Sequence, residues 1–199
     1  MKKIIFDDRY GLTDAVLRGR KTMTRRIIKD HDDPTVFAGS LLCIDKAAYK
    51  IGEEVAVAQS YRSIHEDMMN GDYGDGIYDA FRWAVVDDKP GWNNKMFTLP
   101  MLMPHRIRIT NINVERLQDI SEEDVYREGF EKQSVNNGWG NAAWHWEAML
   151  TYMDRLGLYK DIRSRNPQEA FSVLIDKVSG TGTWDKNPWV FAYEFELIC

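Results

Sequence analysis

The stretch of sequence with the clearest chemical potential is a basic cluster near the amino terminus. Positions 18–29 hold six cationic side chains, which are Arg18, Arg20, Lys21, Arg25, Arg26 and Lys29. A lysine amine can act as a base, and guanidinium groups bind phosphate through paired hydrogen bonds. Three aspartates follow at positions 30, 32 and 33. Two interpretations stay open here: a solvated basic face beside an acidic run, or a site for an anion such as phosphate or a nucleotide.

Most other familiar catalytic motifs are missing from the sequence. It contains no G-x-x-x-x-G-K-[ST] phosphate loop, no G-x-S-x-G nucleophile elbow and no C-x-x-C pair. Its four histidines are scattered, and its two cysteines stand at positions 43 and 199. Because metal-binding sequences usually place their ligands a few residues apart, we expect no metal site and no bound cofactor.

Composition and charge narrow the range of partners. The chain has 199 residues, with 26 Lys and Arg against 31 Asp and Glu, so its formal charge is −5. A negative total disfavours the coating of duplex DNA but permits a local basic site. The apolar runs are far shorter than the roughly 20 residues of a membrane span, and the first residues turn acidic too early for a signal peptide. We therefore expect a cytoplasmic protein without a membrane partner.

The helices that would position the basic cluster can be predicted from capping signals and apolar spacing. A short helix over 13–17 should end before Gly19, and a capping box at 119–124 should open a helix that ends before Gly129. Apolar residues at 146, 149, 150, 153 and 156 predict a helix over about 141–158. Asn166 should begin another helix, with Ala170, Phe171, Leu174 and Val178 on its apolar face.

Strands and loops are predicted from alternation and from turn residues. Strands are expected over 54–58, 80–85, 106–114 and 189–198, with loops over 66–79 and 133–141. Within the third strand, Ile112 and Val114 are out of phase with Ile107 and Ile109. This slip predicts a β-bulge near residues 110–111. Strands separated by irregular loops, with helices early and late, indicate an α+β fold around a mixed or antiparallel sheet.

Four segments resemble one known family in the order in which they occur. Residues 19–24 read G-R-K-T-M-T, residues 52–57 read G-E-E-V-A-V, and residues 120–129 read I-S-E-E-D-V-Y-R-E-G. Together with 171–189, they resemble the ASCH domain of the PUA-like superfamily, in the version carried by phages and mobile elements. Relatives of that type usually have W-V-R-E-x-W where this chain has residues 56–62, with Tyr61 in place of one tryptophan.

The resemblance implies a fold and a ligand class. It implies a single ASCH/PUA-like domain over 1–199, built as a small mixed or antiparallel β-barrel with flanking helices. A loop-rich insertion at about 62–78 and a helical insertion at about 133–165 would be added to that barrel. A cleft would accept RNA or a modified nucleoside or nucleotide. The ligand-binding residues expected on this basis are Gly19, Arg20, Arg25, Arg26, Tyr61 and Trp83.

One branch of the family hydrolyses N4-acylated cytidines, and its functional residues correspond to Lys21, Thr24 and Glu128. In that interpretation Thr24 is the nucleophile, and Lys21 accepts its proton if burial lowers the lysine pKa. Glu128 would orient Lys21 or carry a proton to the leaving amine. Arg26, or a backbone N–H after Gly19, would hold the oxyanion.

The same residues allow other interpretations. Lys21 and Glu128 could form an ion pair that only fixes a helix end to the sheet. Positions 21 and 24 of a regular strand point to opposite faces, so the backbone must turn between them. Three functions remain: an RNA- or nucleoside-binding module, an amidohydrolase of acylated nucleosides, and a phage-related accessory protein with a protein-binding role.

Overall fold

The computed structural model describes residues 1–29, 44–71, 89–136, 142–148, 163–164 and 166–198. Its main element is a five-stranded mixed sheet with the order β1-β3-β4-β8-β2. The strands are β1 (Lys2–Ile4), β2 (Met23–Ile27), β3 (Glu54–Val57), β4 (Arg106–Arg116) and β8 (Trp189–Ile198). β1 runs parallel to β3, and the other neighbouring strands pair antiparallel. The chain therefore has the mixed α+β organisation expected from the sequence.

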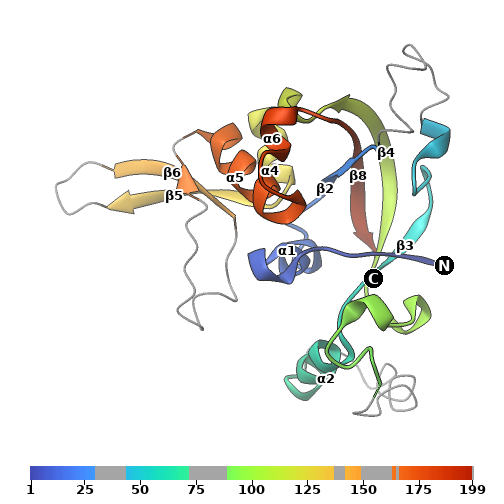
Figure 1. Cartoon of the computed structure of the whole chain (residues 1–199). Coiled ribbons are helices and arrows are strands. Elements are labelled where there is room, and N and C mark those ends of the chain that lie inside the picture. The colour runs from blue at the N-terminus through green and yellow to red at the C-terminus, as the bar shows by residue number, and fades with distance from the viewer. Residues whose placement is uncertain (30–43, 72–88, 137–141, 149–162, 165, 199) are drawn as a thin grey trace.

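The main sheet remains open among the described strands. β1 and β2 lie at its two edges and do not pair with each other. A second sheet of three antiparallel strands has the order β5-β6-β7, with β5 at Phe130–Asn136, β6 at Ala142–Ala148 and β7 at Arg163–Ser164. It extends away from the main body at the left of Figure 1. A closed barrel, as the resemblance implied, is thus not formed by the strands described.

The bulge predicted in the long central strand is present. β4 pairs with β8 from Arg106 to Arg116, and the register shifts between Ile109 and Asn111. Ile107, Ile109 and Ile112 are all buried, because the extra residue returns the apolar positions to the core face.

The helices and short 3-10 turns surround this sheet. They are η1 (Asp8–Tyr10), α1 (Leu12–Leu17), η4 (Ile44–Lys46), α2 (Tyr61–Met69), η5 (Lys95–Phe97), η6 (Pro100–Leu102), η7 (Leu117–Asp119), α4 (Glu122–Arg127), α5 (Pro167–Ser179) and α6 (Thr183–Lys186). The Ser121 hydroxyl accepts from Asp124 N at the start of α4, and the Asn166 amide oxygen caps α5. Both caps agree with the sequence prediction, whereas Val178 is exposed rather than buried.

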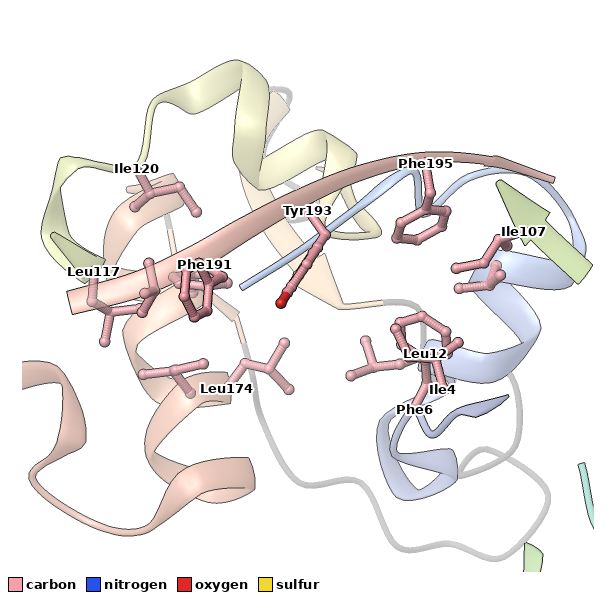
Figure 2. Packing of buried hydrophobic residues seen from close by; sticks show 14 of the residues in the cluster. Ile4, Phe6, Leu12, Ile107, Leu117, Ile120, Leu174, Phe191, Tyr193 and Phe195 are labelled. Atoms are coloured by element: carbon pink, nitrogen blue, oxygen red, sulfur yellow. The ribbon is translucent and has the colours of Figure 1, made fainter. Parts of the chain in front are cut away.

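One large apolar core lies between the main sheet and the helices α1, α4 and α5. Figure 2 shows Phe191, Tyr193 and Phe195 of β8 directed toward Leu174 of α5 and Leu12 of α1. Burial of each large apolar side chain contributes about 1.5–3 kcal/mol. The packing therefore holds α1 and α5 on the same side of the sheet, where the cavity described below opens.

The predicted loop-rich insertion at 62–78 is wrong in its first part. Residues 61–69 form α2, whose start is capped by Ser60 and whose Tyr61, Ile64 and Met68 are buried. These three positions have helical spacing, and that spacing outweighs the polar composition that suggested a loop. The rest of the insertion and the strand expected over 80–85 lie largely outside the described residues.

The predicted helical insertion at 133–165 is also wrong where the structure describes it. Residues 130–136 and 142–148 pair along their whole length as the antiparallel strands β5 and β6. The segments form strands because their backbones hydrogen-bond to each other. The apolar spacing within one segment, which predicted a helix, contains no information about such pairing. The remainder of the helix expected over 141–158, from residue 149, lies outside the described residues.

Candidate functional site

A cavity of about 650 Å³ opens between β2, the start of the chain and α5. Among the described residues its lining comprises Ile5, Phe6, Asp7, Asp8, Arg9, Leu12, Lys21, Thr24, Arg25, Arg26, Ile27, Lys95, Glu128, Phe171, Leu174, Ile175, Val178 and Ser179. Lys21, Thr24 and Glu128 are buried, whereas Asp8, Arg9 and Val178 are exposed. The cavity therefore has a buried polar floor and a rim open to solvent.

Lys21 and Glu128 meet at the floor of this cavity. The Lys21 Nζ lies 2.5 Å from Glu128 Oε2 and also donates to the Glu128 backbone oxygen at 2.9 Å. Lys21 lies in the turn between α1 and β2, ahead of the first strand residue, Met23. The alternation of a strand therefore does not apply between positions 21 and 24, and the side chains of Lys21 and Thr24 both reach the cavity.

A close approach of two backbone segments makes this pairing possible. Gly129 follows Glu128 with a φ of +98°, and a Cβ on Gly129 would lie 3.3 Å from the Cβ atoms of Ala15 and Lys21. The N–H of Thr22 donates to the carbonyl of Arg127 at 2.8 Å. The end of α4 thus lies against the turn that carries Lys21.

Burial sets the protonation chemistry of Lys21. Its exposed fraction is 2%. Removal from water lowers the pKa of Lys21, and this effect exceeds the opposing attraction of the Glu128 carboxylate. Arg26 and Arg25 lower the pKa further by charge repulsion. Lys21 therefore loses its proton more readily than an ordinary lysine, as a base for Thr24 would need to do.

Thr24 lies on the face of β2 that is directed into the molecule. It pairs with Tyr193 of β8, and its exposed fraction is 5%. The Thr24 hydroxyl forms no hydrogen bond with any of the described residues. It is therefore available to a molecule that enters the cavity.

Arg25 is held by acidic side chains of the protein itself. Its guanidinium lies 2.7 Å from Glu115, 2.8 Å from Asp124 and 3.2 Å from Glu128. Burial would lower the pKa of Arg25, but the three carboxylates together raise it. With its side chain 1% exposed, Arg25 fixes the Glu128 carboxylate opposite Lys21 and has little capacity left for a ligand.

Arg26 has different partners. Its Nη2 donates to the carbonyl of Ile5 at 2.7 Å, and its Cζ lies 5.6 Å from the centre of the Phe6 ring. Lys21 Nζ lies 5.8 Å from the centre of the same ring. The Phe6 ring therefore lies within cation–π distance of both Lys21 and Arg26.

The other residues expected to bind a ligand lie elsewhere. Gly19 and Arg20 do not line the cavity, and Arg20 pairs with Asp14 at 2.7 Å. The N–H groups of residues 19–21 donate to carbonyls of α1, so none is free for an oxyanion. Tyr61 is buried in a separate apolar cluster, and its hydroxyl accepts from Leu99 N. Trp83 lies outside the described residues.

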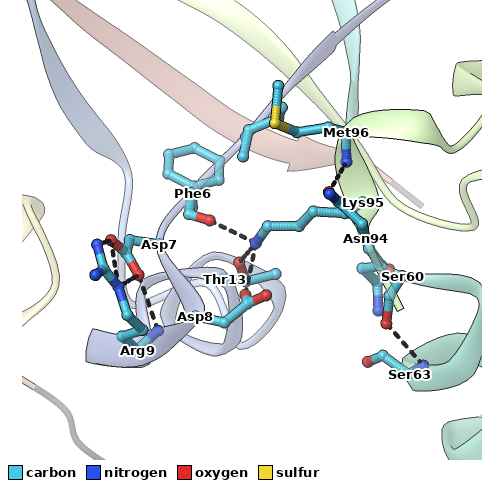
Figure 3. A network of polar contacts seen from close by, with 12 residues as sticks. Phe6, Asp7, Asp8, Arg9, Thr13, Ser60, Ser63, Asn94, Lys95 and Met96 are labelled. Carbon is cyan, nitrogen blue, oxygen red and sulfur yellow. Dashed lines mark hydrogen bonds and ion pairs between the residues drawn. The ribbon is translucent and has the colours of Figure 1, made fainter. Parts of the chain in front are cut away.

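The sequence prediction missed Lys95, which also lines the cavity. Lys95 Nζ donates to the Phe6 carbonyl at 2.5 Å, to Asp8 at 2.6 Å and to the Thr13 hydroxyl at 3.0 Å (Figure 3). These contacts join η5 to η1 and α1. Because more than 80 residues separate Lys95 from its partners, no local pattern could have revealed them.

The described residues provide neither a metal-binding cluster nor a membrane-spanning helix. The described residues contain no group of three or more His, Cys, Asp and Glu side chains arranged to hold a metal ion. Within the same part of the chain, no helix combines the length and apolar character needed to cross a bilayer. Comparisons of the sequence and structure with protein-family models, curated proteins and solved structures find no match.

Proposed function

We propose that this chain is a nucleoside-binding module of the ASCH type with a PUA-like architecture. Its cavity would accept a nucleobase with its sugar, either free or within single-stranded RNA. The observation that carries this proposal is that Lys21, Thr24 and Glu128, the positions singled out by the family resemblance, line one cavity. The mixed sheet with helices packed against it supports the architectural part of the proposal.

The size and lining of the cavity support a small ligand. Pockets for small molecules usually measure about 300–1,000 Å³ and combine apolar walls with a few polar groups. Here α5 supplies the apolar wall through Phe171, Leu174 and Ile175. Thr24 and Arg26 supply hydrogen-bonding groups opposite it. A nucleoside has both a flat apolar face and polar edges, so it suits such a cavity.

Calorimetric titration of the four ribonucleosides and of short single-stranded RNA would test the proposal. We expect at least one of these ligands to bind. Thr24→Val should weaken binding by about tenfold, or ~1.4 kcal/mol, because the free hydroxyl would lose its bond to the ligand. Thr22→Val is the matched control, since Thr22 does not line the cavity. Absence of binding to every ligand tried would overturn the proposal.

Amide hydrolysis is a second candidate, favoured by the lowered pKa of Lys21 and the unbonded hydroxyl of Thr24. In this reaction Thr24 Oγ1 would attack the N4-acyl carbonyl carbon while Lys21 accepts the hydroxyl proton. Collapse of the tetrahedral intermediate would break the C–N bond, and the proton would pass to the leaving amine. Water would then hydrolyse the acyl ester on Thr24 and restore the hydroxyl.

Incubation with N4-acetylcytidine, followed by chromatography, would test this second candidate. We expect release of cytidine and acetate by the wild-type protein and loss of release in Lys21→Met. Lys29→Met is the control, because Lys29 is exposed and does not line the cavity. A wild-type protein that binds nucleosides but releases no cytidine would exclude this hydrolysis and leave the binding function in place.

A further inference from the structure

The charged groups of the cavity are almost completely paired with one another. Four of its five cations contact carboxylates of the protein. The pairs are Arg9 with Asp7 at 2.6 Å, Lys95 with Asp8 at 2.6 Å, Lys21 with Glu128 at 2.5 Å, and Arg25 with Glu115, Asp124 and Glu128. Such pairing neutralises the charges before a ligand enters.

Arg26 is the exception among the described residues. It has no carboxylate partner, and its bonded contact is the neutral carbonyl of Ile5. Its Nε is buried without a hydrogen-bond acceptor. The Ile5 carbonyl and the Phe6 ring hold the guanidinium in place, and Arg26 is part of the cavity lining. A partly buried cation without an anion is costly unless something supplies the missing charge.

Thr24 provides a second contact for the same ligand group. Thr24 and Arg26 are two residues apart in β2, so their side chains share one face of the strand. Both line the cavity, and the hydroxyl of Thr24 has no partner among the described residues. A guanidinium beside a hydroxyl matches a phosphate group, which offers several oxygen acceptors.

We propose that Arg26 forms a phosphate subsite in this cavity, so that the ligand is a nucleotide rather than an uncharged nucleoside. The proposal rests on the proposed function, because it assigns the base and sugar to the remainder of the same cavity. The phosphate can belong to a free nucleotide or to the backbone of single-stranded RNA. The two sources share the same chemistry, and different ligands distinguish them.

The experiment compares each ribonucleoside with its 5′-monophosphate by calorimetry at low salt. We expect the monophosphate to bind at least tenfold more tightly. Arg26→Gln should abolish this preference, and Arg26→Lys should retain part of it. Arg108→Gln is the matched control, since Arg108 lies on β4 away from the cavity and pairs with Glu54 and Glu196.

The outcomes separate this inference from the function on which it rests. If nucleosides bind and monophosphates bind no more tightly, the phosphate subsite is wrong and the binding function stands. If neither class binds, the binding function itself fails. A preference for monophosphate that persists in Arg26→Gln would also overturn the assignment. Trinucleotides without a terminal phosphate that bind as tightly as monophosphates would identify RNA as the source, and tighter binding of monophosphates would identify free nucleotides.

Discussion

The Lys21 amine is buried against the Glu128 carboxylate and the Phe6 ring. Glu128 accepts two of its hydrogen bonds, through a side-chain oxygen and the backbone carbonyl. The Phe6 ring lies beneath it. The lowered pKa of Lys21 shows that burial exceeds the attraction of Glu128. A group in this position is costly to the fold in its charged form, which is typical of functional sites.

This cost predicts a pH dependence of stability. The folded-state pKa of Lys21 lies below its ordinary value of 10.5, so between these two values the unfolded chain binds more protons. The free energy of unfolding should therefore rise with pH across that window, by about 1.4 kcal/mol per unit of pKa difference. Lys21→Met has no such proton to lose. Urea unfolding from pH 7 to 10 should show the wild type gaining stability relative to this variant.

The reference for that measurement is Lys29→Met, whose lysine is exposed. The stability difference from the wild type should change with pH by more for Lys21→Met than for this reference. An equal change for the two variants would contradict the lowered pKa of Lys21.

At the scale of elements, the site depends on where α4 meets the turn between α1 and β2. α4 ends at Arg127, Glu128 caps it, and Gly129 reverses the chain into β5. The positive φ of Gly129 suits glycine, and a Cβ at this position would make tight contacts of 3.3 Å with the Cβ atoms of Ala15 and Lys21. The junction therefore controls the distance between Lys21 and Glu128.

Alanine substitution at two glycines isolates this close approach. Gly129 and Gly52 have φ values of +98° and +82°, but a Cβ at Gly52 would meet nothing within 4 Å. Gly52→Ala should lose about 1–2 kcal/mol of unfolding free energy through backbone strain alone. Gly129→Ala should lose at least about 1 kcal/mol more, because it also overpacks the junction, and it should weaken nucleoside binding. Equal losses in urea unfolding, with binding unchanged, would contradict this role.

At the scale of the whole molecule, two sheets differ in how well they are supported. Residues 190–194 of β8 are paired with β4 on one side and β2 on the other. Among the described residues of the second sheet, β7 pairs with β6 at Trp146 and Glu147, so most of the described β5–β6 ladder is a two-stranded ribbon. Two-stranded ribbons are marginally stable in water.

Hydrogen exchange should resolve this difference. We expect the β8 amides of Ala192 and Tyr193 to exchange only when the whole protein unfolds, since both edges of β8 are covered. The β5 amides of residues 133–136 should exchange much faster through local opening. Mass spectrometry of peptides from the two regions measures both rates. Exchange of both regions at one common rate would indicate that the two sheets open as a single unit.

Local signals in the sequence were sufficient for several elements. The Ser121 and Asn166 caps, the bulge in β4 and the long strand β8 were all predicted from neighbouring residues. Helix caps and strand alternation depend on contacts a few residues apart, so their information is present in a short window. The α+β class follows from the same patterns.

The sequence by itself determined the residue types available for chemistry and several of the surrounding helices and strands, but it did not predict β2, which carries Thr24, Arg25 and Arg26. Tertiary structure alone brought Lys21 into contact with Glu128, which lies 107 positions away in the sequence. It also paired Arg25 with carboxylates of the protein, whereas Arg26 donates to the backbone carbonyl of Ile5. It also paired β5 with β6 where apolar spacing had predicted a helix. The physical reason is that burial, ion pairing and strand pairing depend on distances between segments, which a one-dimensional pattern does not contain.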